Sequence, residues 1–312
     1  MSYNTLKIFD DEATTNDFYE FDVFITKVVE AINDELPNNE SAYSHSILKN
    51  NNVVLKGIIM EREGQNASPT IYMEPYYTSY LNGMKIEDIV LDILNVFKRV
   101  SLDSKLDIDF FFDYEKVKDS LFCKIISFSG NSELLKDVPY DKFLDLAIVP
   151  YCRTKNMPFG EGTILIHNSH IEMWKKTKDE VLCEAIENTR NAMKFKVTPI
   201  MEILKQNGLF DFDGEECNGE VPMFVVTNEE GVFGSIFMVL AETVKEISKK
   251  LGGDFYLLPS SVHESILLPA MAQNNLDTLS AMVKEVNDTS LDAQDILSDR
   301  AYFYNSAKGI FV

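Results

Sequence analysis

The sequence predicts an α+β protein in which helices pack on mixed β-sheets, arranged as two α/β subdomains. Segments with apolar residues at helical spacing are separated by short runs rich in Val, Ile, Phe and Tyr, which are typical of strands. The 312 residues, of which 45% are hydrophobic, are enough for one large or two ordinary domains. We place the boundary between residues 1–105 and residues 106–312.

The first subdomain is predicted to be a helix–sheet–helix unit. Residues 16–36 begin at a good N-cap, Asn16, and carry apolar residues at i, i+3 and i+4 spacing. Residues 45–63 and 70–76 contain short alternating runs separated by turn residues, which predicts a small antiparallel sheet. Residues 84–100 are again helical, with one apolar stripe.

The second subdomain follows a connection over residues 103–122. This segment mixes apolar and acidic residues without a clean period, so we expect a linker that runs into a short helix. Strands are predicted at 123–129, 144–153 and 162–168. The last two are dense enough in Leu, Ile and Val to be central strands.

A helix is predicted over 177–193, because Thr177 and Glu180 form a capping box at its start. The acidic segment 208–220 has little that could pack, so we expect a solvated loop there. The remaining expected elements are a strand at 222–228, a helix at 234–253, strands at 254–260 and 264–270, helices at 275–288 and 291–298, and an edge strand at 301–304.

The protein is strongly acidic. Lys and Arg number 29 against 50 Asp and Glu, which gives a formal net charge of -21. This charge repels phosphate backbones and anionic lipid head groups, so we expect no nucleic-acid or membrane partner, and a basic protein partner is favoured. There is no pattern of a secretory signal and no run of about 18 apolar residues. We therefore expect a cytoplasmic protein.

The stretch LLPSSVHESILLP (257–269) comes closest to a catalytic signature. Ser261, His263 and Glu264 could supply a nucleophile and an acid–base pair. However, His263 and Glu264 do not continue into H-E-x-x-H, and Ser261 does not lie in G-x-S-x-G. We favour a β-turn-β corner in which serine hydroxyls bind turn amides, and we retain the catalytic site as the alternative.

His167 and His170 form the pattern H-N-S-H at a predicted strand-to-helix junction. This spacing can bring two imidazoles to one metal ion, but zinc needs a third and usually a fourth ligand. We favour the alternative in which Asn168 or Ser169 caps the next helix. Trp174, the single tryptophan, is either an exposed anchor for a partner or, in our preferred interpretation, a core residue.

No cofactor is predicted. A P-loop is excluded because the chain contains no Gly-Lys dipeptide, and Gly160-Glu161-Gly162 lacks the third glycine of the dinucleotide fingerprint. The four cysteines lie far apart and form no C-x-x-C pair. We therefore expect reduced thiols that mostly serve packing.

Several blocks of the chain are similar to a known family. They are SPTIYMEPYYTSYLNG, LLKDVPYDKFLDLAIVPYC, ILIHNSHIEMWKKTKDEVLCEAIENT, FVVTN, GGDFYLLPSSVHE and VKEVNDTSLDAQDILSD. From about residue 17 to 304 the chain resembles an uncharacterised family of Gram-positive anaerobes, domain of unknown function five-six-eight-eight. The resemblance implies a bacterial cytoplasmic protein whose PSSVHE block belongs to the family pattern. It implies no activity, cofactor or catalytic residue.

Three functions are compatible with these patterns. The leading prediction is a non-catalytic binding or regulatory module that recognises another protein. The first alternative is a hydrolase or transferase that uses His263 and Glu264 near Ser261, or His170 as a base. The second alternative is a metal-binding protein that uses His167, His170 and a distant ligand. The patterns leave the oligomeric state open.

Overall fold

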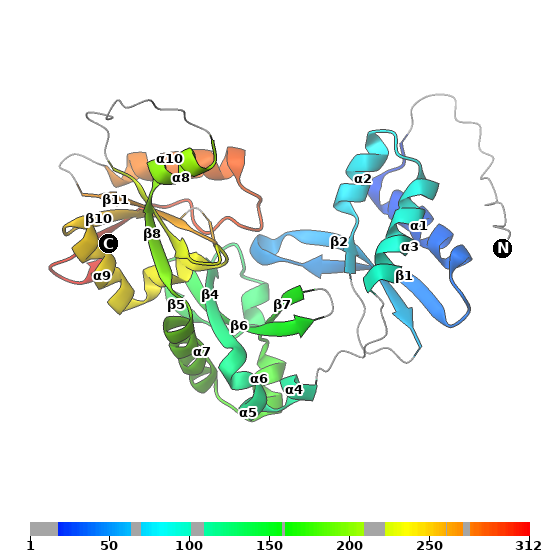
Figure 1. The fold of residues 1–312 in the computed structure, drawn as a ribbon, viewed down its shortest axis with the longest axis horizontal. Coiled ribbons are helices and arrows are strands. Elements are labelled where there is room, and N and C mark those ends of the chain that lie inside the picture. The colour runs from blue at the N-terminus through cyan, green and yellow to red at the C-terminus, as the bar shows by residue number, and fades with distance from the viewer. Residues whose placement is uncertain are drawn as a thin grey trace. The chain divides into compact units, whose positions relative to one another are not determined.

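The computed structural model describes residues 18–63, 70–100, 109–157, 160–208, 222–259, 261–270 and 275–312 (Figure 1). The chain divides into two compact units, one of residues 1–47 and 55–106 and one of residues 48–54 and 107–312. The boundary expected at residue 105, most of the acidic loop expected at 208–220, and Ser260 lie outside the described residues. Residues 48–54 belong to the second unit. The sequence prediction places a single boundary near residue 105 and therefore assigns these residues to the first subdomain.

The first unit combines a small antiparallel sheet with amphipathic helices, as predicted. Its elements are α1 (Phe21–Glu35), β1 (Glu40–Leu48), β2 (Val54–Arg62), β3 (Thr70–Tyr72), α2 (Glu74–Leu81) and α3 (Ile86–Val100), and the strand order is β1-β2-β3. Apolar residues of α1, α3 and the sheet form one core, in which Phe24, Ile58 and Ile93 are fully buried. Gly57 allows β3 to approach β2, because a Cβ atom there would lie 2.3 Å from Cγ2 of Thr70.

Two details of the first unit differ from the sequence prediction. The segment 70–76 is not one strand, because β3 ends at Tyr72 and α2 begins at Glu74. Pro75 lies in the first turn of α2, where its missing N–H group would have no helical partner. The first helix begins at Phe21, and the expected cap Asn16 lies outside the described residues.

The second unit contains a four-stranded antiparallel sheet with β6 at its centre. Its strands are β4 (Leu121–Ser127), β5 (Asp141–Phe143), β6 (Leu146–Met157) and β7 (Gly160–Leu165), and β6 pairs with the three others. Three short helices precede or follow these strands in the chain: α4 (Asp109–Phe112), α5 (Tyr114–Val117) and α6 (Asn168–Trp174). The helix α7 (Lys178–Ala192) opens with the predicted capping box of Thr177 and Glu180. It is attached to β4 by Thr189, whose Oγ1 accepts the Cys123 N–H at 2.9 Å.

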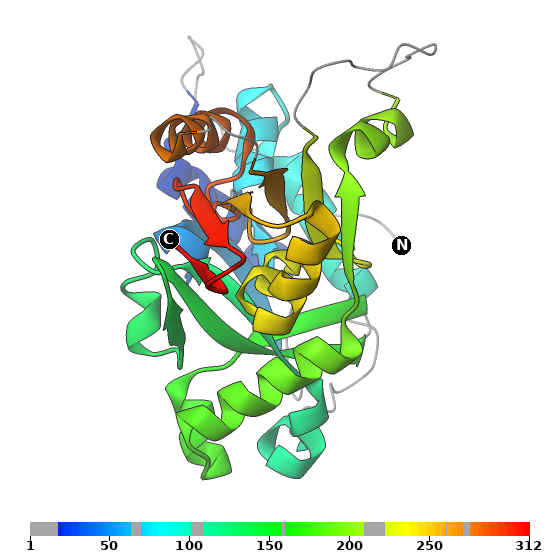
Figure 2. The same ribbon diagram turned by 90° about the vertical axis from the view of Figure 1, so that its left-hand side faces the viewer.

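The second unit also contains a six-stranded antiparallel sheet, in the order β13-β12-β10-β11-β9-β8. Its strands are β8 (Phe195–Pro199), β9 (Phe224–Asn228), β10 (Phe255–Leu258), β11 (Ser265–Pro269), β12 (Tyr302–Asn305) and β13 (Ile310–Phe311); the helices are α8 (Ile200–Gln206), α9 (Ala241–Leu251) and α10 (Leu276–Ser290). Leu257 packs in the cluster that includes α9, whereas Leu258 packs with α10. Figures 1 and 2 show both helices against this sheet. The expected edge strand at 301–304 is internal, because β13 pairs with β12.

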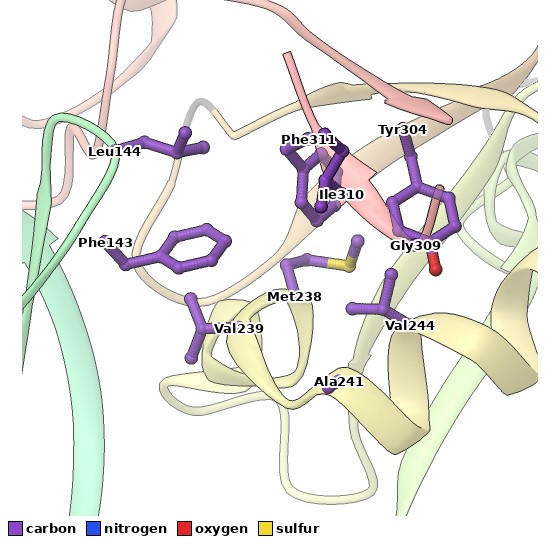
Figure 3. Close-up of a pocket in the computed structure, with 10 residues that line it drawn as sticks. All are labelled: Phe143, Leu144, Met238, Val239, Ala241, Val244, Tyr304, Gly309, Ile310 and Phe311. Carbon is purple, nitrogen blue, oxygen red and sulfur yellow. The ribbon is translucent and has the colours of Figure 1, made fainter. Parts of the chain in front are cut away.

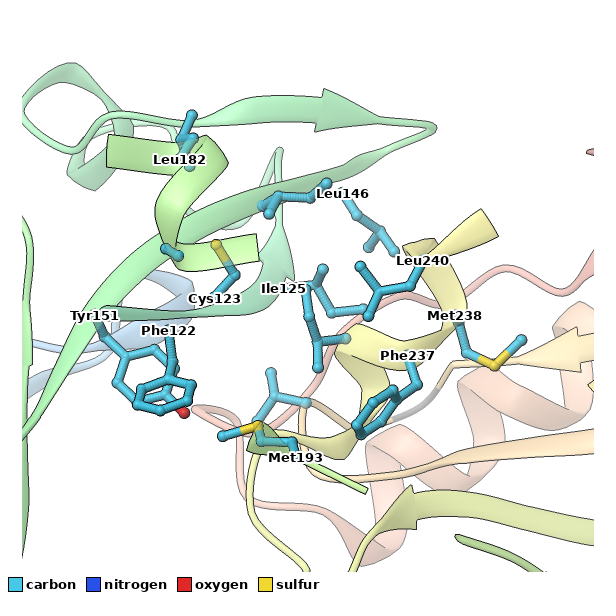
Figure 4. Packing of buried hydrophobic residues seen from close by; sticks show 14 of the residues in the cluster. Phe122, Cys123, Ile125, Leu146, Tyr151, Leu182, Met193, Phe237, Met238 and Leu240 are labelled. Carbon is cyan, nitrogen blue, oxygen red and sulfur yellow. The ribbon is translucent and has the colours of Figure 1, made fainter. Parts of the chain in front are cut away.

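The largest cluster of buried residues in the described part of the second unit joins these two sheets and the helices α6 and α7. Figure 4 shows Ile125 of β4 near Phe237 and Leu240, which belong to the segment between β9 and α9. The burial of this segment explains why the helix predicted over 234–253 is divided into a 3-10 turn and α9. Residues Gly234–Val239 form a 3-10 turn in which five consecutive residues are buried, and Leu240 is extended. A segment surrounded by core on all sides has no solvent face and therefore no need for the 3.6-residue period.

The helix predicted at 291–298 is also absent. After α10 ends at Ser290, the described residues up to the start of β12 contain no helix. Their backbone groups bind other parts of the unit instead: the carbonyl of Asp295 accepts the Val262 N–H at 2.9 Å, and the Ser298 N–H donates to the carbonyl of Pro259 at 3.1 Å. Tertiary hydrogen bonds therefore replace helical ones in this segment.

Candidate functional site

The stretch 257–269 folds as the connection between two antiparallel strands. Leu258 of β10 pairs with Ile266 of β11, and Ser261 lies in the turn with 6% of its surface exposed. Oγ of Ser261 accepts the His263 N–H at 3.1 Å, and its carbonyl accepts the hydroxyl of Ser235 at 2.7 Å. Ser261 thus makes the turn contacts expected of a corner residue.

The imidazole of His263 is engaged by protein groups on both ring nitrogens. Nδ1 accepts the N–H of Phe233 at 3.3 Å, which assigns the proton to Nε2. Nε2 lies 3.5 Å from Oδ1 of Asp295, and the ring stacks on Phe233 with centroids 5.5 Å apart. Glu264 is exposed. The ring of His263 therefore faces neither Glu264 nor the hydroxyl of Ser261 within the described residues.

The backbone carbonyl of His263 also takes part in hydrogen bonds. It accepts the N–H of Gly234 at 2.9 Å and the hydroxyl of Thr227 at 2.9 Å. A Cβ atom at Gly234 would lie 2.6 Å from the Asn228 nitrogen, so the close approach of these segments requires glycine. These hydrogen bonds and the close packing at Gly234 account for the conformation of the turn without a catalytic role.

His167 and His170 begin the helix α6 rather than flank a cap at Asn168 or Ser169. His167 is the N-cap residue, and its N–H donates to Nδ1 of His170 at 3.0 Å. Nδ1 of His167 lies 2.8 Å from Oδ2 of Asp137. Burial, and the neighbouring His167, lower the pKa of His170. Within the described residues, no group of three or more His, Cys, Asp or Glu side chains is arranged to hold a metal ion.

Trp174 is a core residue. Its side chain is in the main cluster with 6% of its surface exposed, and Nε1 donates to the carbonyl of Phe111 at 2.7 Å. The ring of Phe111 also contacts His170, at a centroid distance of 4.9 Å. The indole therefore fastens α6 to α4 and is not available as an exposed anchor.

Lys124 is a residue that sequence reasoning missed. It lies half-buried on β4, with Nζ 4.5 Å from the centroid of the Phe233 ring. Burial, with a smaller contribution from Lys49, lowers the pKa of Lys124 to about 8. No carboxylate partner is found in the described part of the chain. A perturbed lysine is a functional candidate, and its sequence signal is a single cation inside the apolar strand CKIIS.

A polar cavity of about 560 Å³ opens in the second unit. Its lining comes from three separate parts of the chain: Asn51; Ser127, Ser129, Gly130 and Asp145; and Ala293, Ile296, Leu297, Ser298, Asp299 and Arg300. Asp145 is held in the wall by two hydroxyl groups, because Oδ2 accepts from Ser298 at 3.1 Å and Oδ1 accepts from Tyr302. Burial, and this bond to Asp145, raise the pKa of Tyr302.

Asn51 lines the cavity from the connection between β1 and β2. Its backbone is left-handed, with φ of 59°, a conformation that asparagine tolerates better than most residues. Its Nδ2 donates to the carbonyls of Ala293 at 2.8 Å and Ile296 at 2.6 Å, and its N–H donates to Oδ1 of the fully buried Asn131 at 2.8 Å. The cavity wall is thus organised before any ligand enters.

The comparisons with known proteins identify the family of this chain. No curated protein and no solved structure matches it. In the described residues, no helix has the length and apolar character needed to cross a bilayer. The model of the family of unknown function DUF5688 matches residues 21–306, which includes most of both units and the residues of the cavity. The chain belongs to the DUF5688 family.

Proposed function

We propose that this protein is a non-catalytic binding module of the cytoplasm, and that its polar cavity receives a basic side chain of a protein partner. The observation that carries the proposal is the carboxylate of Asp145 in the cavity wall, fixed by Ser298 and Tyr302. Each carboxylate oxygen can accept more than one hydrogen bond. A lysine or arginine side chain could therefore bind Asp145 without displacing the two hydroxyl groups.

The charge of the cavity and of the whole chain supports a basic ligand. Asp299 in the lining accepts from Asn287 at 2.8 Å and lies 3.6 Å from Nζ of Lys284, so a cation already lies beside it. The two groups that donate to Asp145 are uncharged hydroxyls. Among the described residues that line the cavity, Arg300 is the one cation. The net charge of -21 adds long-range attraction for a basic partner.

The geometry of the two histidine segments supports binding over catalysis. Both ring nitrogens of His263 face protein groups, and Nδ1 of His170 accepts a backbone N–H. A general base needs a free nitrogen within reach of the proton that it removes. The catalytic alternative would therefore require both segments to rearrange.

The test measures binding of a fluorescent oligolysine peptide to the full chain by anisotropy. Asp145→Asn keeps the size and removes the charge, so we expect about a tenfold to hundredfold loss of affinity, the effect of one charge-assisted hydrogen bond. Asp292→Asn is the matched control, because Asp292 is exposed and does not line the cavity. Its effect should stay within about twofold.

Two results would overturn the proposal. One is an equal loss of affinity in Asp145→Asn and Asp292→Asn, which would show that the peptide responds only to net charge. The other is a reproducible hydrolase or transferase turnover that is lost in His263→Ala while the fold is retained. Circular dichroism of each variant separates these results from unfolding.

A further inference from the structure

A second pocket, of about 240 Å³, lies elsewhere in the second unit (Figure 3). It is bordered by the β5–β6 turn, the segment before α9, the start of α9 and the hairpin of β12 and β13. The lining residues are Phe143, Leu144, Met238, Val239, Ala241, Val244, Tyr304, Gly309, Ile310 and Phe311. It shares no residue with the polar cavity, so a ligand here would be separate from the proposed partner site.

The chemistry of the lining selects a neutral ligand. The lining residues that the structure describes carry no charge, and the hydroxyl of Tyr304 is the one polar side-chain group among them. A charged ligand would lose its hydration without gaining an ion pair, which is unfavourable. An apolar ligand with at most one hydrogen-bonding group fits this lining.

The shape of the lining favours an aromatic ligand. Phe143 and Phe311 meet edge to face with centroids 6.0 Å apart, and Phe311 lies 5.0 Å from Tyr304. Such rings offer both edges and faces to a further ring, and the thioether of Met238 adds a favourable sulfur–aromatic contact. A cavity of about 150 Å³ holds benzene, so a cavity of about 240 Å³ has room for two fused rings.

Backbone conformation and exposure at the pocket mouth provide an independent observation. Leu144 has a left-handed backbone with φ of 55°, which is uncommon for a leucine, and strained residues concentrate at ligand-binding positions. Leu144 is 37% exposed and Ile310 is 48% exposed. These two apolar side chains border the pocket together with Phe143 and Phe311 (Figure 3), where a bound ligand would cover them.

We infer that this pocket binds a neutral aromatic compound of one or two rings, with one polar group directed to the hydroxyl of Tyr304. The test uses indole as the probe, titrated into the full chain by calorimetry and by ligand-observed NMR. Ala241 is the exposed first residue of α9 and lines the pocket. Ala241→Phe should fill the entrance without disturbing the core and reduce indole affinity by about tenfold or more.

Ala241→Ser is the matched control, because it changes the same position with little added volume, and its affinity should remain within about threefold of the unchanged protein. Tyr304→Phe should weaken indole by about fivefold, the effect of one neutral hydrogen bond. Lack of indole binding at millimolar concentration, equal affinity in Ala241→Phe, or binding of hexanol in preference to indole would overturn the inference. Unchanged oligolysine binding in Ala241→Phe would show that the two sites are independent.

Discussion

Replacement of Lys124 by methionine should stabilise the protein at neutral pH. Lys124 is half-buried on β4, and burial, assisted by Lys49, lowers its pKa from 10.5 to about 8. The folded state therefore disfavours the ammonium group that the unfolded chain carries in water. Methionine has a similar length, is uncharged, and adapts to irregular packing, so it can occupy the same space beside Phe233.

The magnitude follows from the change in pKa. A fall from 10.5 to about 8, at about 1.4 kcal/mol for each pKa unit, gives a penalty of about 3 kcal/mol for the charged form. Water screens the partly exposed ammonium, and the variant loses the cation–π contact to Phe233. We therefore expect Lys124→Met to raise the free energy of unfolding at pH 7 by about 1–2 kcal/mol.

The same shift predicts a pH dependence with a definite sign. Between pH 8 and pH 10.5 the unfolded chain retains a proton that folded Lys124 has released, so stability of the unchanged protein rises with pH in this window. The advantage of Lys124→Met should accordingly shrink as the pH is raised from 7 to 10. Other groups that titrate in this range affect both proteins equally and cancel in the difference.

Urea denaturation followed by circular dichroism at pH 7 and pH 10 measures both effects. Lys245→Met, at an exposed position of α9, is the control and should change stability by less than about 0.5 kcal/mol. The reasoning is refuted if Lys124→Met is neutral or destabilising at pH 7, or if its advantage is the same at both pH values.

Three further predictions concern polar groups that are buried or half-buried. Asn131→Ala removes the acceptor of the Asn51 N–H and should lower the free energy of unfolding by about 2–4 kcal/mol, measured in urea. Trp174→Phe leaves the carbonyl of Phe111 without its indole donor and should cost about 1–2 kcal/mol in the same assay. The lowered pKa of His170 means that the unfolded chain takes up a proton first as the pH falls below 6.5. His170→Gln should therefore lose less stability than the unchanged protein between pH 7.5 and 5.5.

Each of these predictions has an outcome that contradicts it. Asn131→Ala with unchanged stability would mean that the contact at Asn51 contributes nothing to folding. An unaltered urea midpoint in Trp174→Phe would show that the indole N–H bond is dispensable. For His170→Gln, a stability loss on acidification as large as that of the unchanged protein would assign the pH dependence to other groups.

Sequence information alone determined the features of this protein that depend on local chemistry. The apolar stripes of α3 and α7 and the capping box of Thr177 and Glu180 predict their helices, because a helix satisfies its backbone and positions its apolar face from neighbouring residues. The strand β9 and the turn at Ser261 were predictable for the same reason. The α+β class follows from these elements and is confirmed by the structure.

Only the tertiary structure decided the features that depend on distant residues. Asp145 meets Ser298 across 153 positions of the chain, and Asn51 binds the Ile296 carbonyl across 245, so no local pattern could reveal the polar cavity. The 3-10 turn at Gly234–Val239 and the lowered pKa of Lys124 likewise result from burial by other elements. Burial and long-range hydrogen bonds are properties of the folded chain, and at these positions they override local preference.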